Sequence, residues 1–190
     1  MIQMIKNHKK LKPYICSEIE DAGMHIDIAG DLGENDYAAI KVDDYYMGQH
    51  DATPPKAVDF LTTVDCTCNS YALYILELKN IHSPKNLSMS AVREKFTTTI
   101  ERFMMEEYRD IFLNDKFKYK LIKLYLVSSL YNAAGQYKNY EEYRKRLEKA
   151  GRRDTLRVDR LMIEKPFRFR NWVLRIEHEI PPNPVIRRIL

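Results

Sequence analysis

Two neighbouring stretches of the chain are almost uniformly apolar and carry only a few charges. They are residues 57–65 (AVDFLTTVD) and residues 71–79 (YALYILELK), and both are rich in aliphatic, aromatic and β-branched side chains. Such runs lack the polar and apolar alternation of a half-solvated sheet, so they predict strands that are covered on both faces. The five residues between them, CTCNS, contain an Asn-Ser pair that is typical of turns. The pattern therefore predicts a buried β-hairpin.

The charged positions of this hairpin fall on one face. If the turn is symmetric about residue 68, Asp59 lies directly opposite Glu77, and opposed side chains stand about 4.5–5.5 Å apart at Cβ. Alternation along the strand puts Lys79 on the same face as Glu77 and Leu78 on the other. A register slip of one residue would send Asp59 to the opposite face. The hairpin thus predicts two carboxylates with an ammonium beside them, a set of groups that suits a hard divalent cation.

The remaining apolar positions predict helices and strands on both sides of the hairpin. The expected elements are a helix up to about residue 22 with a break at Pro13, a strand over residues 37–47, a helix over 90–112, a strand over 119–130 and a polar helix over 136–150. Helical spacing of apolar residues supports the 90–112 helix. The order is α-β-β-β-α-β, and its last strand, helix, strand step favours a right-handed crossover onto one sheet.

The size and composition of the chain are those of a single α/β domain. The chain has 190 residues, of which 45% are hydrophobic and 31% charged, which suits one sizeable core. We expect residues 1–150 to form this core and residues 151–190 to be an extension packed on the same domain. The sequence contains no apolar run of the roughly 20 residues that span a membrane and no signal-peptide layout at its start. A cytoplasmic location is therefore expected.

Charge is distributed unevenly along the chain. Residues 13–66 contain twelve acidic and two basic residues, although the whole chain has a net charge of +4. An acidic cluster suits a divalent cation and a basic remainder suits a phosphate backbone. The charge pattern is therefore compatible with metal-dependent chemistry on nucleic acid.

The C-terminal part mixes basic and aromatic residues. Residues 151–190 hold ten basic and five acidic residues, and Arg168, Arg170 and Trp172 stand close together among them. Such a mixture can grip phosphates and stack on bases, so these three residues are candidates for DNA binding. Two alternatives remain open, namely an edge segment whose aromatic side chains cap the core and an arm that binds a partner protein.

The cysteines and histidines do not indicate a zinc site. Cys16, Cys66 and Cys68 are odd in number and lack a Cys-x-x-Cys spacing, and the five histidines are scattered without a close pair. We therefore expect reduced cysteines and no designed zinc site.

The arrangement Asp59 followed by Glu77-x-Lys79 resembles the motif of the PD-(D/E)XK nuclease superfamily, which includes many type II restriction endonucleases and archaeal Holliday-junction resolvases. The resemblance covers about residues 10 to 130, and Val58 stands where that motif has a proline. It implies a restriction-endonuclease-like three-layer core with a central mixed sheet flanked by helices. It also implies that Asp59, Glu77 and the backbone carbonyl of Leu78 hold Mg²⁺, with Mn²⁺ able to substitute, and that Lys79 orients the attacking water.

Some members of this superfamily contribute a further carboxylate from their first helix. By this resemblance Glu18 and Glu20 are catalytic candidates, and the alternative for each is an ordinary surface charge on a helix. Both glutamates therefore stay candidates.

The function that the resemblance implies is Mg²⁺-dependent cleavage of double-stranded DNA by a restriction endonuclease. The small size favours the catalytic small subunit of a heterodimeric type IIS enzyme, whose larger partner reads the DNA, and a homodimer is the alternative. A Holliday-junction resolvase-like nuclease is the enzymatic alternative. A non-catalytic, nuclease-like assembly subunit, in which Glu77 and Lys79 form a strand-end ion pair, is the alternative from a different class.

Overall fold

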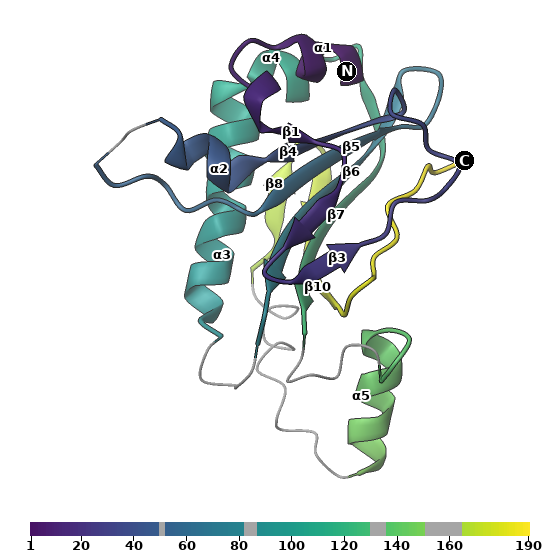
Figure 1. The fold of residues 1–190 in the computed structure, drawn as a ribbon. Helices are drawn as coiled ribbons and strands as arrows, with labels where there is room; N and C mark the ends of the chain where they lie inside the picture. Colours follow the sequence, from purple (N-terminus) through teal and green to yellow (C-terminus); the bar gives the residue numbers. More distant parts are fainter. Residues whose placement is uncertain (50–51, 82–86, 130–135, 151–164) are drawn as a thin grey trace.

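A six-stranded mixed sheet forms the centre of the computed structural model, which describes residues 1–49, 52–81, 87–129, 136–150 and 165–190 (Figure 1). The strand order is β1-β4-β5-β6-β7-β10. The strands are β1 (Ile15–Cys16), β4 (Tyr37–Lys41), β5 (Phe60–Asp65), β6 (Ser70–Lys79), β7 (Lys118–Ser128) and β10 (Ile176–Glu179). Strands β1, β4, β5 and β6 are antiparallel neighbours, whereas β7 runs parallel to both β6 and β10. The expected α/β class with a central mixed sheet is confirmed.

The β5–β6 hairpin has the register that the sequence predicted. Phe60 pairs with Leu76 and Asp65 pairs with Tyr71. The turn between the strands contains three residues with positive φ, Thr67, Cys68 and Asn69. Continued by one step beyond the ladder, this register sets the residue before β5 opposite Glu77, and that residue is Asp59.

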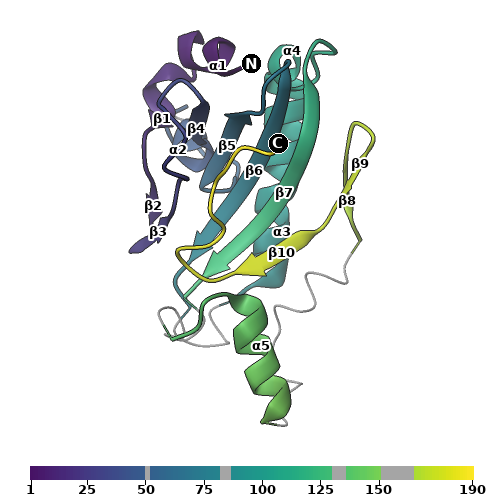
Figure 2. The ribbon, with the colours of Figure 1, turned by 90° about the vertical axis from the view of Figure 1, so that its right-hand side faces the viewer.

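Helices cover one face of the sheet (Figures 1 and 2). They are α1 (Ile2–Asn7), α3 (Met89–Thr97), the π-helix η3 (Thr98–Glu107) and α4 (Arg109–Phe112). The predicted helix over 90–112 is thus confirmed as a helical segment with three parts. Its buried side chains share one core with residues of β4, β5, β6 and β7; they are Val92, Phe96, Ile100, Phe103, Met104, Ile111 and Phe112.

Two extended segments cover the other face. One is the hairpin of β2 (Ile19–Asp21) and β3 (Met24–Ile26), and the other is the chain that follows β10. The two segments meet where Ile28 forms a parallel bridge with Ile186. Ile186 is completely buried beside apolar residues of β6. The sheet is therefore buried on both faces at β5 and β6, as their uniform apolar character predicted.

The helix predicted up to residue 22 is wrong. Helix α1 ends at Asn7, a 3₁₀-helix (Lys12–Tyr14) contains Pro13, and the following residues form β1 and the β2–β3 hairpin. The pair Ala22-Gly23, which resembles a helix stop, has φ of 52° and 72°. Positive φ at both central residues is the geometry of a two-residue hairpin turn. The helical interpretation therefore mistook a hairpin turn for a helix end.

The strand predicted over residues 37–47 is only half right. Strand β4 ends at Lys41, and residues 42–47 form helix α2 (Val42–Met47). Val42, Tyr45 and Tyr46 are its buried residues, a spacing that belongs to a helix and not to a strand. This short helix places Asp43 near the start of β5, because Val42 N–H donates to Asp59 O at 3.1 Å.

The C-terminal half contains the other expected elements and one further strand of the sheet. The predicted strand over 119–130 is β7, and the predicted helix over 136–150 is α5 (Tyr140–Lys149), capped by the Asn139 side chain at Glu142 N–H. A small hairpin of β8 (Phe167–Phe169) and β9 (Trp172–Leu174) precedes β10. None of the helices within the described ranges is long and apolar enough to cross a membrane.

Candidate functional site

Asp59 lies immediately before β5 and points toward the end of β6. Its Oδ2 accepts a hydrogen bond from Leu78 N–H at 2.6 Å, and the residue is buried. The backbone carbonyl of Leu78 faces the same edge of β6, because the N–H and C=O of one strand residue point to the same neighbour. Strand geometry therefore brings a carboxylate and a carbonyl to one place.

Glu77 meets Asp59 through a shared cation, the Lys95 ammonium. Lys95 Nζ lies 2.7 Å from Glu77 Oε1, 2.8 Å from Glu77 Oε2 and 3.3 Å from Asp59 Oδ1. The two carboxylates therefore converge on one point, as the predicted register required. We call Asp59, Glu77 and Lys95 the carboxylate–lysine cluster.

Helix α3 positions Lys95, and η3, which continues it, holds the backbone just before β5. Ser88 caps the helix by accepting from Ala91 N–H. One turn after Lys95, Thr99 Oγ1 accepts from Val58 N–H at 3.1 Å and donates to Lys95 O at 3.0 Å. Residues four apart lie on the same helix face. One face of the helix thus contacts both the Asp59 carboxylate and the backbone next to it.

Lys95 was not among the residues selected from the sequence. A signal for it exists, because Lys95 lies between Val92, Phe96 and Thr99 on the side of the helix that faces the sheet, and these three residues are fully buried. A lysine within an apolar helical stripe needs a buried partner. The partners of Lys95 are two carboxylates, Asp59 just before β5 and Glu77 on β6. The periodicity of the helix alone could not identify them.

Burial dominates the electrostatics of the cluster. Loss of solvent raises the pKa of Asp59, although the Lys95 ammonium and the Leu78 hydrogen bond act against the rise. Burial and then the charge of Asp59 raise the pKa of Glu77. Burial alone would lower the pKa of Lys95, but the two carboxylates outweigh it and raise this pKa. Lys95 and the two carboxylates therefore stabilise each other's charges, whereas the carboxylates oppose one another's ionisation.

Two further acidic residues act on the cluster. Burial, followed by the charge of Asp59, raises the pKa of Asp43 to about 6. The charge of Asp21, at the end of β2, contributes to the raised pKa of Asp59. Asp21 and Asp43 are therefore within electrostatic range of Asp59.

Lys79 lies on the predicted face, two residues after Glu77, and is half-buried. Its charge opposes the rise of the Glu77 pKa, so the ammonium is within electrostatic range of that carboxylate. The structure thus brings Asp59 and Glu77 together and sets Lys79 beside them, while Lys95 makes the close contacts to the two carboxylates.

The glutamates proposed from the first helix are not on a helix. Glu18 and Glu20 are exposed, Glu20 belongs to β2, and both line a surface hollow with Lys41. The two-residue turn after Asp21 folds this segment into a hairpin. From this hairpin, Asp21 is the residue whose charge acts on Asp59.

The candidate DNA-binding residues lie on the β8–β9 hairpin. Arg170 donates to the carbonyls of Phe117 at 2.9 Å and Asn114 at 2.6 Å, and its guanidinium lies 4.9 Å from the centre of the Tyr119 ring. Trp172 packs against the core on the helical side of the sheet, and Arg168 is exposed. Arg170 and Trp172 therefore have structural contacts, as the edge-segment alternative describes, and DNA binding by the three residues stays a prediction.

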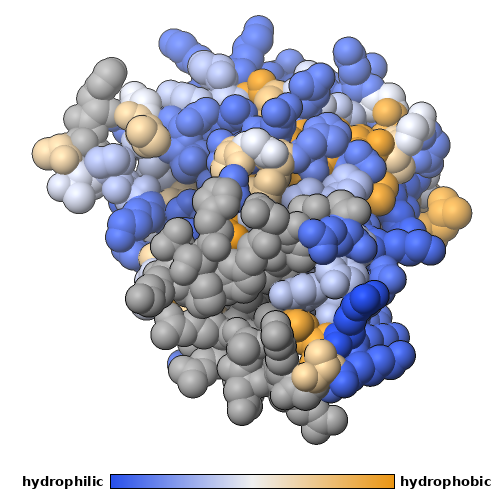
Figure 3. Space-filling view, turned by 60° about the horizontal axis from the view of Figure 1, so that its bottom comes forward, coloured by the Kyte–Doolittle hydropathy of each residue, from blue (hydrophilic) through white to orange (hydrophobic). Residues whose placement is uncertain are grey.

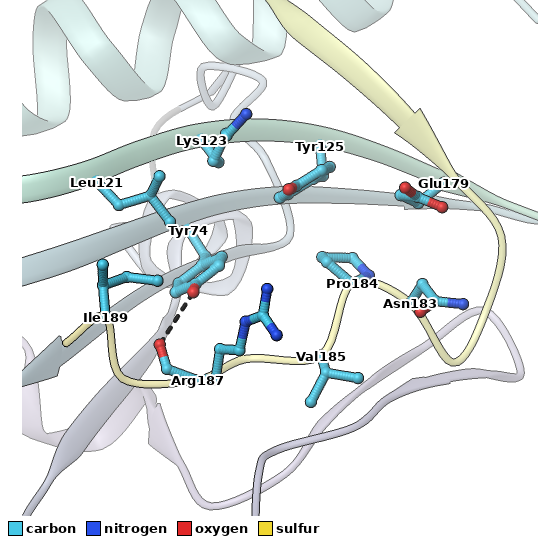
Figure 4. A pocket seen from close by; sticks show the side chains of 10 residues that line it. All are labelled: Tyr74, Leu121, Lys123, Tyr125, Glu179, Asn183, Pro184, Val185, Arg187 and Ile189. Carbon is cyan, nitrogen blue, oxygen red and sulfur yellow. Dashed lines mark hydrogen bonds between the residues drawn. The ribbon is translucent and has the colours of Figure 1, made fainter. Parts of the chain in front are cut away.

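A separate pocket of about 410 Å³ lies on the opposite face of the sheet, between β6, β7 and the C-terminal chain (Figure 4). Tyr74 lines it and donates to Arg187 O at 2.9 Å. Tyr74 and Glu77 are an odd number of residues apart on β6, so their side chains point to opposite faces. The pocket is therefore not part of the carboxylate–lysine cluster.

The chemistry of the cluster fits a hard divalent cation. Mg²⁺ prefers oxygen ligands and binds through one or two carboxylates, and here Asp59 and Glu77 already share one positive group. Within the described ranges, no group of three or more His, Cys, Asp or Glu side chains is arranged to hold a metal ion. A metal at this point would therefore rely on two carboxylates, the Leu78 carbonyl and water.

Comparison with known proteins identifies no relative. No family model, no curated protein and no solved structure matches this chain.

Proposed function

We propose that this protein is a Mg²⁺-dependent endonuclease that hydrolyses phosphodiester bonds of double-stranded DNA. The observation that carries the proposal is the convergence of the Asp59 and Glu77 carboxylates on one cation, the Lys95 ammonium. Lys79 stands on the same face, as the PD-(D/E)XK resemblance expects. The mixed α/β sheet supports the same superfamily, whose restriction-endonuclease-like core remains part of the proposal.

In this proposal Asp59, Glu77 and the Leu78 carbonyl hold Mg²⁺, which Mn²⁺ can replace. When bound, such an ion polarises a phosphate oxygen and lowers the pKa of a bound water. The protein itself supplies a dry, fixed pair of carboxylates, because Asp59 is anchored by Leu78 N–H and both carboxylates are buried. Carboxylates preorganised in this way need little movement of their own when a ligand arrives.

Lys79 has the role of orienting the attacking water and of balancing charge on the phosphate. Its side chain is half-buried at the end of β6, beside Glu77. An ammonium there can donate to a phosphate oxygen as negative charge develops in the transition state. Lys79 is thus the catalytic residue that touches substrate.

We further propose a cytoplasmic restriction–modification enzyme whose chain is the catalytic small subunit of a heterodimer. Much of the described chain builds the sheet and its cover, and of the three candidate DNA contacts Arg170 and Trp172 already have structural contacts. DNA recognition is then assigned to a larger partner subunit, or to a second copy of this chain. On the face that Figure 3 shows, most of the coloured side chains are hydrophilic.

Plasmid cleavage tests the catalytic proposal. Supercoiled plasmid is incubated with Mg²⁺ and the wild type, or with Asp59→Asn, Glu77→Gln and Lys79→Ala variants. We expect nicking by the wild type, weak if a larger subunit is needed, and loss of at least about 100-fold in each variant. Lys56→Met is the matched control, because Lys56 pairs with Glu94 at the surface. Full activity in the Asp59 and Lys79 variants would refute the proposal.

The same assay separates the types of nuclease. Four-way-junction DNA is compared with linear duplex of the same sequence at equal concentration. Preference for the junction would favour the resolvase-like alternative. Site-specific cleavage of duplex by this chain alone would exclude the heterodimer proposal and favour a homodimeric restriction enzyme.

A non-catalytic assembly subunit is the second candidate, and the Lys95 contacts favour it. One ammonium contacts both carboxylates at 2.7–3.3 Å, which is also how a purely structural buried ion pair is built. Calorimetric titration with Mn²⁺ discriminates between the two candidates. A structural ion pair gives no binding that depends on Asp59, whereas the nuclease gives binding that Asp59→Asn removes.

A further inference from the structure

Lys95 is the solvent-facing member of the carboxylate–lysine cluster. Its side chain is 24% exposed, against 6% for Asp59 and 1% for Glu77. Lys95 is therefore the member of the cluster whose side chain reaches solvent, while both carboxylates lie behind it. A cation that arrives from solvent meets Lys95 first.

The ammonium also uses the oxygen atoms that a metal ion would need. Nζ contacts both oxygens of Glu77 and Oδ1 of Asp59, while Asp59 Oδ2 accepts from Leu78 N–H. Each of the four carboxylate oxygens thus already has a donor. A Mg²⁺ ion takes its ligands at about 2.0–2.1 Å, and a metal bound by both carboxylates would need the point between them that Nζ occupies, 2.7–3.3 Å from their oxygens, so the ion and the ammonium cannot both be there.

We propose that Lys95 is a built-in competitor of the divalent cation: its ammonium holds the cation position between Asp59 and Glu77, and the metal binds when the Lys95 side chain moves out. This inference rests on the proposed function. It assigns to Lys95 control over the metal affinity of the site, which is a role distinct from that of Lys79.

The structure gives Lys95 a way out and gives the metal a reason to replace it. A lysine has a flexible four-carbon stem and a strongly hydrated head group, and the exposed part of Lys95 already reaches solvent. Asp21 and Asp43 add negative charge next to Asp59. A single ammonium leaves this charge partly uncompensated, so a dication gains more from the site than the lysine does.

The outward position places Lys95 at the mouth of the site. There its ammonium, which remains attached to α3, can contact a phosphate group of a nucleic acid. Metal and phosphate then favour the same outward state of one side chain. Binding of each should therefore strengthen binding of the other, because coupling between two sites is reciprocal.

Calorimetric titration of the full chain with Mn²⁺ alone tests the competition. Lys95→Met removes the ammonium but keeps most of the unbranched side chain, and we expect the dissociation constant of its Mn²⁺ complex to be at least about tenfold lower than that of the wild type. Lys56→Met is the matched control, since it removes the same charge from an exposed pair with Glu94 and should bind as the wild type does. Asp59→Asn combined with Lys95→Met should abolish the gain.

The outcomes separate this inference from the proposed function. If the wild type and Lys95→Met bind Mn²⁺ equally, or the variant binds more weakly, the metal site stands and the competition is refuted. If neither protein binds Mn²⁺, both proposals fail. If circular dichroism shows that Lys95→Met does not fold, the Lys95→Arg variant tests the inference instead. Arginine keeps the positive charge and has more donors, so we expect Lys95→Arg to bind Mn²⁺ more weakly than the wild type. Binding as tight as that of the wild type would refute the inference.

Discussion

Lys95 Nζ lies 2.7 Å from Glu77 Oε1, and this ion pair joins helix α3 to strand β6 inside the protein. The Glu77 side chain is almost fully buried, and Asp59 shares the same ammonium. Breaking a buried pair on one side leaves an uncompensated charge, which costs more than an exposed pair contributes. The cluster is therefore a sensitive point of the fold, whatever it binds.

Replacing Lys95 with methionine should destabilise the protein by about 3 kcal/mol at pH 8. Asp59 and Glu77 already have raised pKa values through burial, and loss of the ammonium raises both further. Between their unfolded and folded pKa values the native state binds more protons than the unfolded chain, so stability falls as pH rises. The deficit against the wild type should therefore be smaller at pH 5 than at pH 8, as measured by urea unfolding.

Lys56→Met provides the control for that measurement. Lys56 and Glu94 are 60% and 54% exposed, so removing their ion pair should change stability by less than about 1 kcal/mol at either pH. A Lys95→Met deficit that is the same at pH 5 and pH 8 would contradict the electrostatic explanation.

Replacing Thr99 with valine should destabilise the backbone that leads into β5 and contains Asp59. The Thr99 hydroxyl accepts from the buried Val58 N–H, and valine has the same shape without an acceptor. An unsatisfied buried donor costs about 1–3 kcal/mol. Urea unfolding measures the loss, and amide hydrogen exchange at Val58 should quicken. Thr99→Ser keeps the hydroxyl, and a larger loss for serine than for valine would refute the role of the hydrogen bond.

The hairpin could be predicted from the sequence because its information is local. The uniformly apolar strands require burial on both faces, and a turn symmetric about residue 68 sets Asp59 opposite Glu77. The observed pairing of Phe60 with Leu76 confirms that reasoning. The opposition of the two carboxylates thus follows from the strand pattern together with a symmetric turn, and the face of Lys79 follows from alternation along the strand.

Lys95 and the N-terminal hairpin could not be predicted in the same way. Lys95 reaches the carboxylates only because α3 packs on this part of the sheet, and that packing is a tertiary property. The apolar residues Ile15 and Ile19 are four apart and fit a helix as well as two short strands. The positive φ of Ala22 and Gly23 shows that these residues form a hairpin turn. An Ala-Gly pair occurs both at helix ends and in turns, so the sequence does not reveal these φ values.

Arg170 should be important for stability, whereas Arg168 should not. Arg170 bonds two carbonyls and lies over the Tyr119 ring, so Arg170→Ala should cost about 2 kcal/mol. Arg168 is exposed on β8, and Arg168→Ala should change stability by less than about 0.5 kcal/mol. Thermal or urea unfolding compares the two variants. Equal, small losses of stability in the two variants would show that the Arg170 contacts contribute little to the free energy of unfolding. A separate measurement of duplex DNA binding tests Arg168, and weaker binding by Arg168→Ala alone would support a DNA contact there.

His178 should make the protein less stable as the solution becomes acidic. The ring is buried against Tyr140, with Nε2 2.6 Å from Ser128 Oγ, and burial lowers its pKa to about 3. Between the unfolded pKa of about 6.5 and the folded value, the unfolded chain binds the extra proton, so stability is lost as pH falls through this window. From pH 7 to pH 5 this single group should lower the free energy of unfolding by about 2 kcal/mol.

His178→Gln is the control, because it keeps a polar group near Ser128 but does not titrate. Its free energy of unfolding should therefore fall by about 2 kcal/mol less over the same interval. Parallel urea titrations at the two pH values measure this difference, and identical pH dependence in both proteins would show that His178 does not carry the acid sensitivity.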